Sequence, residues 1–131
     1  MFTTRVIPLA AALALSGAVL AAPPIASAKN GNGVRATGTC TQSSTSKLKL
    51  SGENARIEVE FEVDQNRNGV RWTVTLRRNG ALSVSTRATT RSPSGSFSVR
   101  RLLTNGSGGD VVSARAVSPS GEVCTARATF G

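Results

Sequence analysis

The segment from Asp64 to Gly69, with the sequence DQNRNG, carries oxygen-bearing side chains at the spacing that begins a calcium-binding loop. Such a loop also needs a bidentate carboxylate at its twelfth position, which is Thr75 here, and it lies between helices. Apolar and polar residues instead alternate on both sides of the segment. Asp and Asn side chains that bond their own backbone explain the segment without a metal, and Asn68-Gly69 is typical of a tight turn. We therefore predict a β-hairpin here, and we expect no metal or other cofactor.

Four carboxylates alternate with apolar residues just before this turn, namely Glu58, Glu60, Glu62 and Asp64. Two such groups are what a glycoside hydrolase needs as acid and base. In the predicted hairpin, however, they lie beside Arg71 and Arg77 on the outer face, where each oppositely charged pair across strands contributes about 0.2 to 1 kcal/mol. A row of acids along one strand is more typical of a solvated, charge-paired face than of a catalytic pair.

Other enzymatic chemistry lacks its usual residues. The sequence contains no histidine, which excludes Ser-His-Asp and Cys-His arrangements and the commonest zinc ligand. It also contains no tyrosine and a single tryptophan, Trp72, at the centre of an alternating segment. That position favours a core tryptophan over a platform on which a ligand stacks. We therefore expect a protein without enzymatic activity.

The N-terminal segment has the order of a secretory signal peptide. Arg5 precedes an apolar run from Val6 to Ala22, and Ala26-Ser27-Ala28 matches a small-residue cleavage site. The apolar run is shorter than the roughly 20 residues that span a membrane. We predict that residues 1–28 are removed, that residues 29–33 form a flexible lead, and that no transmembrane segment remains. The protein is then secreted, either extracellular or associated with the cell envelope, with one domain of about 100 residues.

The two cysteines, Cys40 and Cys124, are expected to form a disulfide, because an even pair in an oxidising compartment is normally bonded. A reactive thiol or half of a metal site is the alternative, but no histidine or further cysteine is available to complete such a site. The bond would close a loop of about 85 residues and remove about 4 to 5 kcal/mol of unfolded-chain entropy. We therefore expect it to staple the fold.

Period-two alternation continues through the mature chain and predicts seven or eight short strands separated by Gly, Pro, Asn and Ser residues. The sharpest alternation covers residues 57–64 and 70–77, and Leu82 continues it on the inward parity of the next strand. Asn79-Gly80 is a further hairpin signal, and residues 104–110 form the longest irregular loop. This regularity predicts an all-β antiparallel β-sandwich over residues 34–131, with the disulfide joining its first and last strands.

Several stretches resemble the small exported immunoglobulin-like proteins of actinobacteria: GVRWTVTL at 69–76, SGSFSV at 94–99 and GEVC at 121–124. The resemblance implies an immunoglobulin-like or fibronectin-type sandwich, with Trp72 near the place of the buried core tryptophan. It carries no functional residues to this chain. The cysteines differ from those of antibody domains, which lie on two central strands.

Basic residues outnumber acidic ones, with 16 Lys and Arg against 7 Asp and Glu. Guanidinium groups donate paired hydrogen bonds to phosphate and carboxylate groups. Six arginines fall on the outward parity of the predicted strands and are the candidate polyanion-binding residues: Arg71, Arg77, Arg87, Arg100, Arg115 and Arg127. They act together only if the strand order brings them onto one face; otherwise the excess charge reflects composition alone.

We therefore expect a monomeric binding or structural module that adheres electrostatically to an anionic polymer, such as teichoic acid or an acidic polysaccharide. Nucleic acid is not the partner expected in the cell. Two alternatives stay open: a protein-interaction domain that meets an envelope protein through loops or edge strands, and a carrier of a small ligand. A clustered arginine patch favours the first function, an exposed apolar patch the second, and a deep apolar cavity the third.

Overall fold

The computed structural model describes residues 26–27 and 33–131. The predicted signal peptide and flexible lead, residues 1–28 and 29–33, lie outside this part except for Ala26, Ser27 and Gly33. No helix long and apolar enough to cross a membrane occurs among the described residues.

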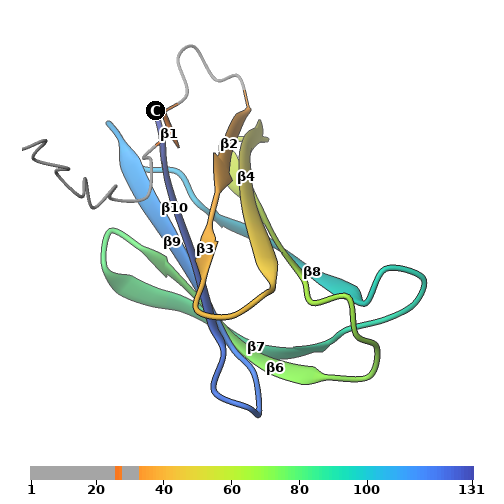
Figure 1. The fold of residues 1–131 in the computed structure, drawn as a ribbon. Coiled ribbons are helices and arrows are strands. Elements are labelled where there is room, and N and C mark those ends of the chain that lie inside the picture. The colour runs from red at the N-terminus through yellow and green to blue at the C-terminus, as the bar shows by residue number, and fades with distance from the viewer. Residues whose placement is uncertain (1–25, 28–32) are drawn as a thin grey trace, which may run out of the picture.

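The strands form two sheets that face each other as a β-sandwich (Figure 1). The first, named here the β5 sheet, has the order β2 (Val34–Thr37), β4 (Thr45–Glu53), β5 (Arg56–Asp64), β8 (Ser96–Thr104). The second, the β9 sheet, has the order β1 (Ala26–Ser27), β10 (Val123–Phe130), β9 (Asp110–Val117), β6 (Arg71–Arg78), β7 (Ala81–Thr89), and β3 (Thr39–Cys40) also pairs with β10. Neighbouring strands are antiparallel, apart from the parallel pair β1 and β10. The predicted all-β sandwich is confirmed.

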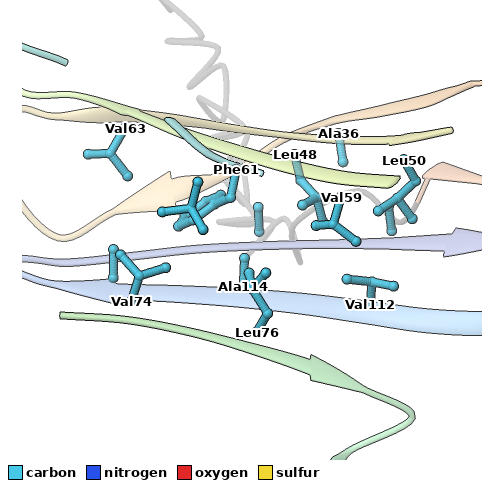
Figure 2. Packing of buried hydrophobic residues seen from close by; sticks show 14 of the residues in the cluster. Ala36, Leu48, Leu50, Val59, Phe61, Val63, Val74, Leu76, Val112 and Ala114 are labelled. Atoms are coloured by element: carbon cyan, nitrogen blue, oxygen red, sulfur yellow. The ribbon is translucent and has the colours of Figure 1, made fainter. Parts of the chain in front are cut away.

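Alternation of residue types places the apolar side chains between the sheets. All four apolar residues of β5 are fully buried, while the acidic residues between them are half-buried. Figure 2 shows Phe61 and Val63 from this sheet facing Val74 and Leu76 from the β9 sheet. Burial of such side chains is the main source of the sandwich's stability.

Trp72 belongs to this core, as predicted. It is fully buried and contacts Phe97 of β8 across the sandwich, with ring centroids 6.0 Å apart and planes tilted by 54°. Its indole Nε1 donates a hydrogen bond of 3.0 Å to Gln65 Oε1, so the one polar atom of the ring has a partner.

β2 and β3 follow each other almost directly but belong to different sheets, because the chain changes sheet at Gly38. The residues before it, β2, pair with β4, and the residues after it, β3, pair with β10. Gly38 N donates to Ser46 O at 2.8 Å, and a Cβ at this position would overlap Ser46 Oγ and Thr125 O. Only glycine therefore lets the backbone pass this closely between the sheets.

The predicted disulfide is confirmed and lies just after this change of sheet. Cys40 and Cys124 stand directly opposite each other in the β3–β10 pair, with their Cα atoms 4.1 Å apart. The bond therefore joins β3 to β10, the last strand, within the β9 sheet.

The predicted hairpin at Asp64–Gly69 is wrong. β5 pairs with β4 and β8, whereas β6 pairs with β7 and β9, so the segment between them crosses from one sheet to the other. The local hydrogen bonding that motivated the prediction does exist, since Asn66 N donates to Asp64 Oδ1 at 2.9 Å.

Buried Thr90 holds this crossover in place. Its hydroxyl donates to Arg67 O at 2.6 Å and accepts from Val70 N at 2.9 Å, and its carbonyl accepts from Gly69 N at 2.8 Å. The positive φ of Gly69, 76°, thus serves a connection between sheets. As a consequence, the acids of β5 and the arginines of β6 lie on opposite outer faces, and the predicted ion pairs between them do not form.

Asn79-Gly80 does form the predicted hairpin, between β6 and β7, with φ angles of 50° and 82°. The nearby loop at residues 104–110 is tied to it by Asp110, which is almost fully buried. The Asp110 carboxylate accepts hydrogen bonds from Arg78 Nε at 2.8 Å, Asn79 Nδ2 at 3.0 Å and Gly106 N at 2.8 Å.

Candidate functional site

Five of the six candidate arginines share the outer face of the β9 sheet, and each is exposed. They come from four neighbouring strands: Arg71 and Arg77 on β6, Arg87 on β7, Arg115 on β9, Arg127 on β10. Strand order, which the sequence left open, therefore brings most of the predicted surface together.

Three of these arginines surround Ser113. Across the strands, Ser113 on β9 stands directly opposite Arg127 on one side and Arg77 on the other. Arg115 follows two residues further along β9, and its own neighbours are Thr125 and Thr75. Side chains directly opposite on antiparallel strands point to the same face. The result is a shallow hollow of about 290 Å³, lined by the three guanidinium-bearing side chains and by the three half-buried hydroxyl residues.

A second hollow, of about 480 Å³, lies on the same face toward β7. Arg71 and Arg87 line it, together with Thr73 and Ser85. Thr73 stands directly opposite Arg87 in the β6–β7 pair, so Thr73 lines this hollow as Thr75, two residues later on β6, lines the first.

No carboxylate neutralises this face. All seven acidic residues are in the described part of the chain, and five of them belong to β4 and β5 of the other sheet. The remaining two, Asp110 and Glu122, are buried at the ends of the β9 sheet. The ion pairs among the described residues involve Arg78 and Arg100, so the five arginines have no carboxylate within 4.0 Å.

Both buried carboxylates have structural roles. Burial would raise the pKa of Asp110, but the hydrogen bonds from Gly106 N, Asn79 and Arg78, together with the charge of Arg78, outweigh burial and lower this pKa below its ordinary value. Glu122 accepts from Ser44 N at 3.0 Å, from the Ser44 hydroxyl and from Gln42 N at 3.1 Å, which ties the loop after β3 to the β9–β10 hairpin.

Glu122 also lies close to the disulfide, with ligand-type atoms of Cys40, Cys124 and Glu122 within 4.8 Å of one another. Metal ions bind cysteine as the free thiolate. Because both sulfur atoms are bonded to each other, this cluster offers one carboxylate and no thiolate ligand. The cluster is therefore a disulfide beside a hydrogen-bonded carboxylate.

Arg100 is the candidate that the structure places elsewhere. It lies on β8 at the edge of the β5 sheet, opposite Glu60. Its Nη2 contacts Glu60 Oε2 at 2.9 Å and its Nε lies 3.6 Å from Glu58 Oε1. Arg100 thus forms the ion pairs with the β5 acids that the sequence had assigned to the two arginines of β6.

The outer face of the β5 sheet carries both charges. Lys47 and Lys49 of β4 stand directly opposite Glu62 and Glu60 of β5, and Arg35 lies beyond them on β2. A hollow of about 450 Å³ on this face is larger than the one around Ser113, but both acids and all three basic residues line it. The charge of the residues that line each hollow, and not its volume, therefore distinguishes the two faces as binding surfaces.

A β-bulge modifies the β9 sheet beside Arg77. The register of β6 with β7 shifts between Leu76 and Arg77, so that Leu76 pairs with Val84 and Arg77 with Leu82. One extra residue on β7 reverses the facing of the residues before it. Leu82, predicted to face inward, therefore stands beside Arg77 and is 55% exposed.

Two parts of the surface were not predicted from the sequence. The hydroxyls of Thr75, Ser113 and Thr125 were seen only as polar spacers, although their parity already placed them among the arginines. Arg91 lies in a loop, where the alternation of a strand cannot predict which way a side chain points. With Arg87 it lines a further hollow at the β7 edge. The signal available for it was its position next to the Ser92-Pro93-Ser94-Gly95 turn, four residues after Arg87.

Comparisons with protein-family models, with curated proteins and with solved structures give no match to this chain. Its function is therefore inferred from the geometry of the arginine-rich face.

Proposed function

We propose that this protein is a non-enzymatic binding module that adheres to anionic polymers through the outer face of its β9 sheet. The observation that carries this proposal is the collection of five exposed arginines on one face without a single neighbouring carboxylate. Such a face attracts polyanions through its summed potential, and each guanidinium adds a geometry suited to phosphate or carboxylate oxygens.

The spread of the arginines over four strands also suits a polymer. An extended chain can lie across several strands and contact arginines from each of them, whereas a small ligand gains most from a deep apolar pocket. In the proposed setting the module is exported as a monomer and meets teichoic acid, an acidic polysaccharide or a similar polymer of the cell envelope. The predicted secretion and the excess of basic residues support this setting.

We also propose kinship with the small exported immunoglobulin-like proteins of actinobacteria. The two-sheet antiparallel sandwich supports it at the level of architecture. The strand order differs from that of antibody domains, because β5 continues the sheet of β4, whereas the third strand of an antibody domain crosses to the opposite sheet.

A protein-interaction role is the second candidate. The exposed large hydrophobic side chains among the described residues are Leu82 and Leu102, and they lie on the edge strands β7 and β8. Edge strands offer unpaired backbone groups to a partner strand. These two residues belong to different sheets, so the arginine-rich face provides the larger continuous surface.

The proposal is tested by removing the same charge from each face. One variant carries Arg77→Ser, Arg115→Ser and Arg127→Ser, and its matched control carries Arg35→Ser, Lys47→Ser and Lys49→Ser. Binding to single-stranded DNA, used as a defined phosphate polymer, is measured against salt concentration. Three lost phosphate contacts should lower the slope of log affinity against log salt by about 2.

The control variant should keep the slope and nearly all of the affinity, and Arg100→Ser should do the same. Equal losses in the two triple variants would show that net charge alone drives binding, which would overturn the proposed face. Binding to purified teichoic acid is then compared in the same variants.

A further inference from the structure

The five arginines form two separate groups, and we infer that the face holds two anion sites that together select a phosphodiester chain by its length. The Ser113 site consists of the hollow with Arg77, Arg115 and Arg127. The Arg87 site consists of the hollow with Arg71 and Arg87. This inference rests on the proposed function, since both sites lie on the same face.

The register fixes the distance between the two sites. The Ser113 site is centred on β9, and the Arg87 site lies between β6 and β7 and about three residues away along the strand direction. Neighbouring strands are about 4.8 Å apart and each residue adds about 3.3 Å along a strand, so the centres are roughly 12 Å apart. One phosphate group is too small to occupy both sites.

The path between the sites is open to a polyanion. Thr73 and Thr75 on β6 lie between the two groups of arginines, and each lines one of the hollows. Their hydroxyls offer hydrogen bonds to a passing chain, and no acidic residue stands on this path. Arg91 extends the series beyond Arg87 at the β7 edge.

The Ser113 site favours phosphate over carboxylate. Its three guanidinium groups come from three different strands and therefore approach an anion from three directions. A carboxylate presents two oxygens in one plane, which suits one bidentate arginine. A phosphate group presents its oxygens tetrahedrally, so that donors from several directions, including the Ser113 hydroxyl below, reach them at the same time.

Two linked sites make affinity depend on length in steps. A short anion occupies one site and is bound weakly, because the face is exposed to water and salt. Once the chain reaches the second site, that contact becomes intramolecular and raises the affinity by about 100-fold or more, provided that the chain spans the gap. A uniform basic face would instead give a gradual rise with each added charge.

Thymidylate oligomers of two to twelve nucleotides serve as a phosphodiester ruler, with affinities measured at low salt by fluorescence anisotropy. We expect weak, nearly constant binding of the shortest oligomers, followed by a rise of about 100-fold or more within two or three added nucleotides. The variant with Arg71→Ser and Arg87→Ser should keep the weak binding of short oligomers and lose the rise. The variant with Arg77→Ser and Arg127→Ser should lose the rise and weaken the short oligomers as well.

A smooth increase with length in the unaltered protein would overturn the two-site inference while leaving polyanion binding on this face intact. An absence of salt-sensitive binding at every length would instead overturn the proposed function itself. Oligogalacturonates of matched charge test the preference for phosphate, and they should bind at least several-fold more weakly. Equal binding of both series would overturn that preference. Thermal unfolding of each variant verifies that these exposed substitutions leave the fold unchanged.

Discussion

The two outer faces of this sandwich have the same construction and different electrostatics. On the β5 sheet, Glu60 and Glu62 stand opposite the two lysines of β4, and Arg100 of β8 forms ion pairs with Glu58 and Glu60. On the β9 sheet, serine and threonine occupy the positions between the arginines. The first face neutralises its own charge, whereas the second leaves its charge available to a ligand.

This difference shows that the net charge of the chain does not locate a binding surface. Both faces carry several basic residues, and the hollow on the mixed face is larger than the one around Ser113. What separates them is a single acidic strand, β5, which the fold assigns to one sheet. Exposed cross-strand pairs of opposite charge contribute little to stability, so the acids of β5 should affect binding more than they affect folding.

Removal of the disulfide between β3 and β10 should have the largest effect. The variant Cys40→Ala, Cys124→Ala loses a cross-link over a sequence separation of 84. Its free energy of unfolding should therefore be lower by about 4 to 5 kcal/mol. Urea unfolding, followed by Trp72 fluorescence and by circular dichroism, measures this loss.

Because one core supports both faces, the two signals should change together in a single transition. Two separated transitions would show that the sheets unfold independently and that the two faces do not share one rigid core. The reduced, unaltered protein is the matched control and should unfold at the same urea concentration as the variant.

Removal of its acids should convert the mixed face into a basic one. Replacement of Glu58, Glu60 and Glu62 by threonine frees Arg100 and the two lysines of β4, and threonine is well tolerated on an exposed strand face. We expect affinity for a long phosphate polymer at low salt to rise by at least 10-fold. The same three substitutions should restore binding to the variant with Arg77→Ser, Arg115→Ser and Arg127→Ser.

Restored binding would show that the absence of carboxylates is what makes a face of this sandwich bind. If the added threonines leave binding unchanged in both backgrounds, the particular arrangement around Ser113 matters more than the sign of the face. The salt slope of the restored binding distinguishes phosphate contacts from other attraction.

The smallest effect concerns the buried acid of the β9 sheet. Since the folded pKa of Asp110 lies below its unfolded pKa, the ionised group stabilises the fold above the unfolded pKa, and this contribution is lost as the pH falls through the folded pKa. The stability difference between the unaltered protein and Asp110→Asn should therefore shrink as the pH is lowered from about 6 to about 3. A difference that stays constant over this range would contradict the assignment.

Local pattern predicted what depends on local geometry. Period-two alternation identified most of the buried residues, the outward facing of all six arginines and the burial of Trp72 in the core. Compartment and an even cysteine count predicted the disulfide. These properties follow from a strand's two faces and from the chemistry of one residue pair, so they need no knowledge of the neighbouring strand.

Sheet membership could not be predicted in the same way, because it depends on contacts between distant residues. Asn68-Gly69 looked like a hairpin turn, but the hydrogen bonds from and to Thr90, about 20 residues later, make it a crossover. The error moved two arginines onto the wrong face relative to the β5 acids. The bulge that exposes Leu82 was equally invisible, since only the pairing with β6 defines it.

The position of the disulfide also determines what a protease can do to this protein. Cys40 and Cys124 enclose four of the five arginines of the basic face within one covalent loop, together with the crossover that contains Arg67 and the turn that contains Arg91. A trypsin-like enzyme in the surrounding medium cuts after arginine, and loops are the accessible places. A single cut at either connection leaves both fragments joined through the sulfur atoms, so a nicked molecule still carries every strand of its binding face.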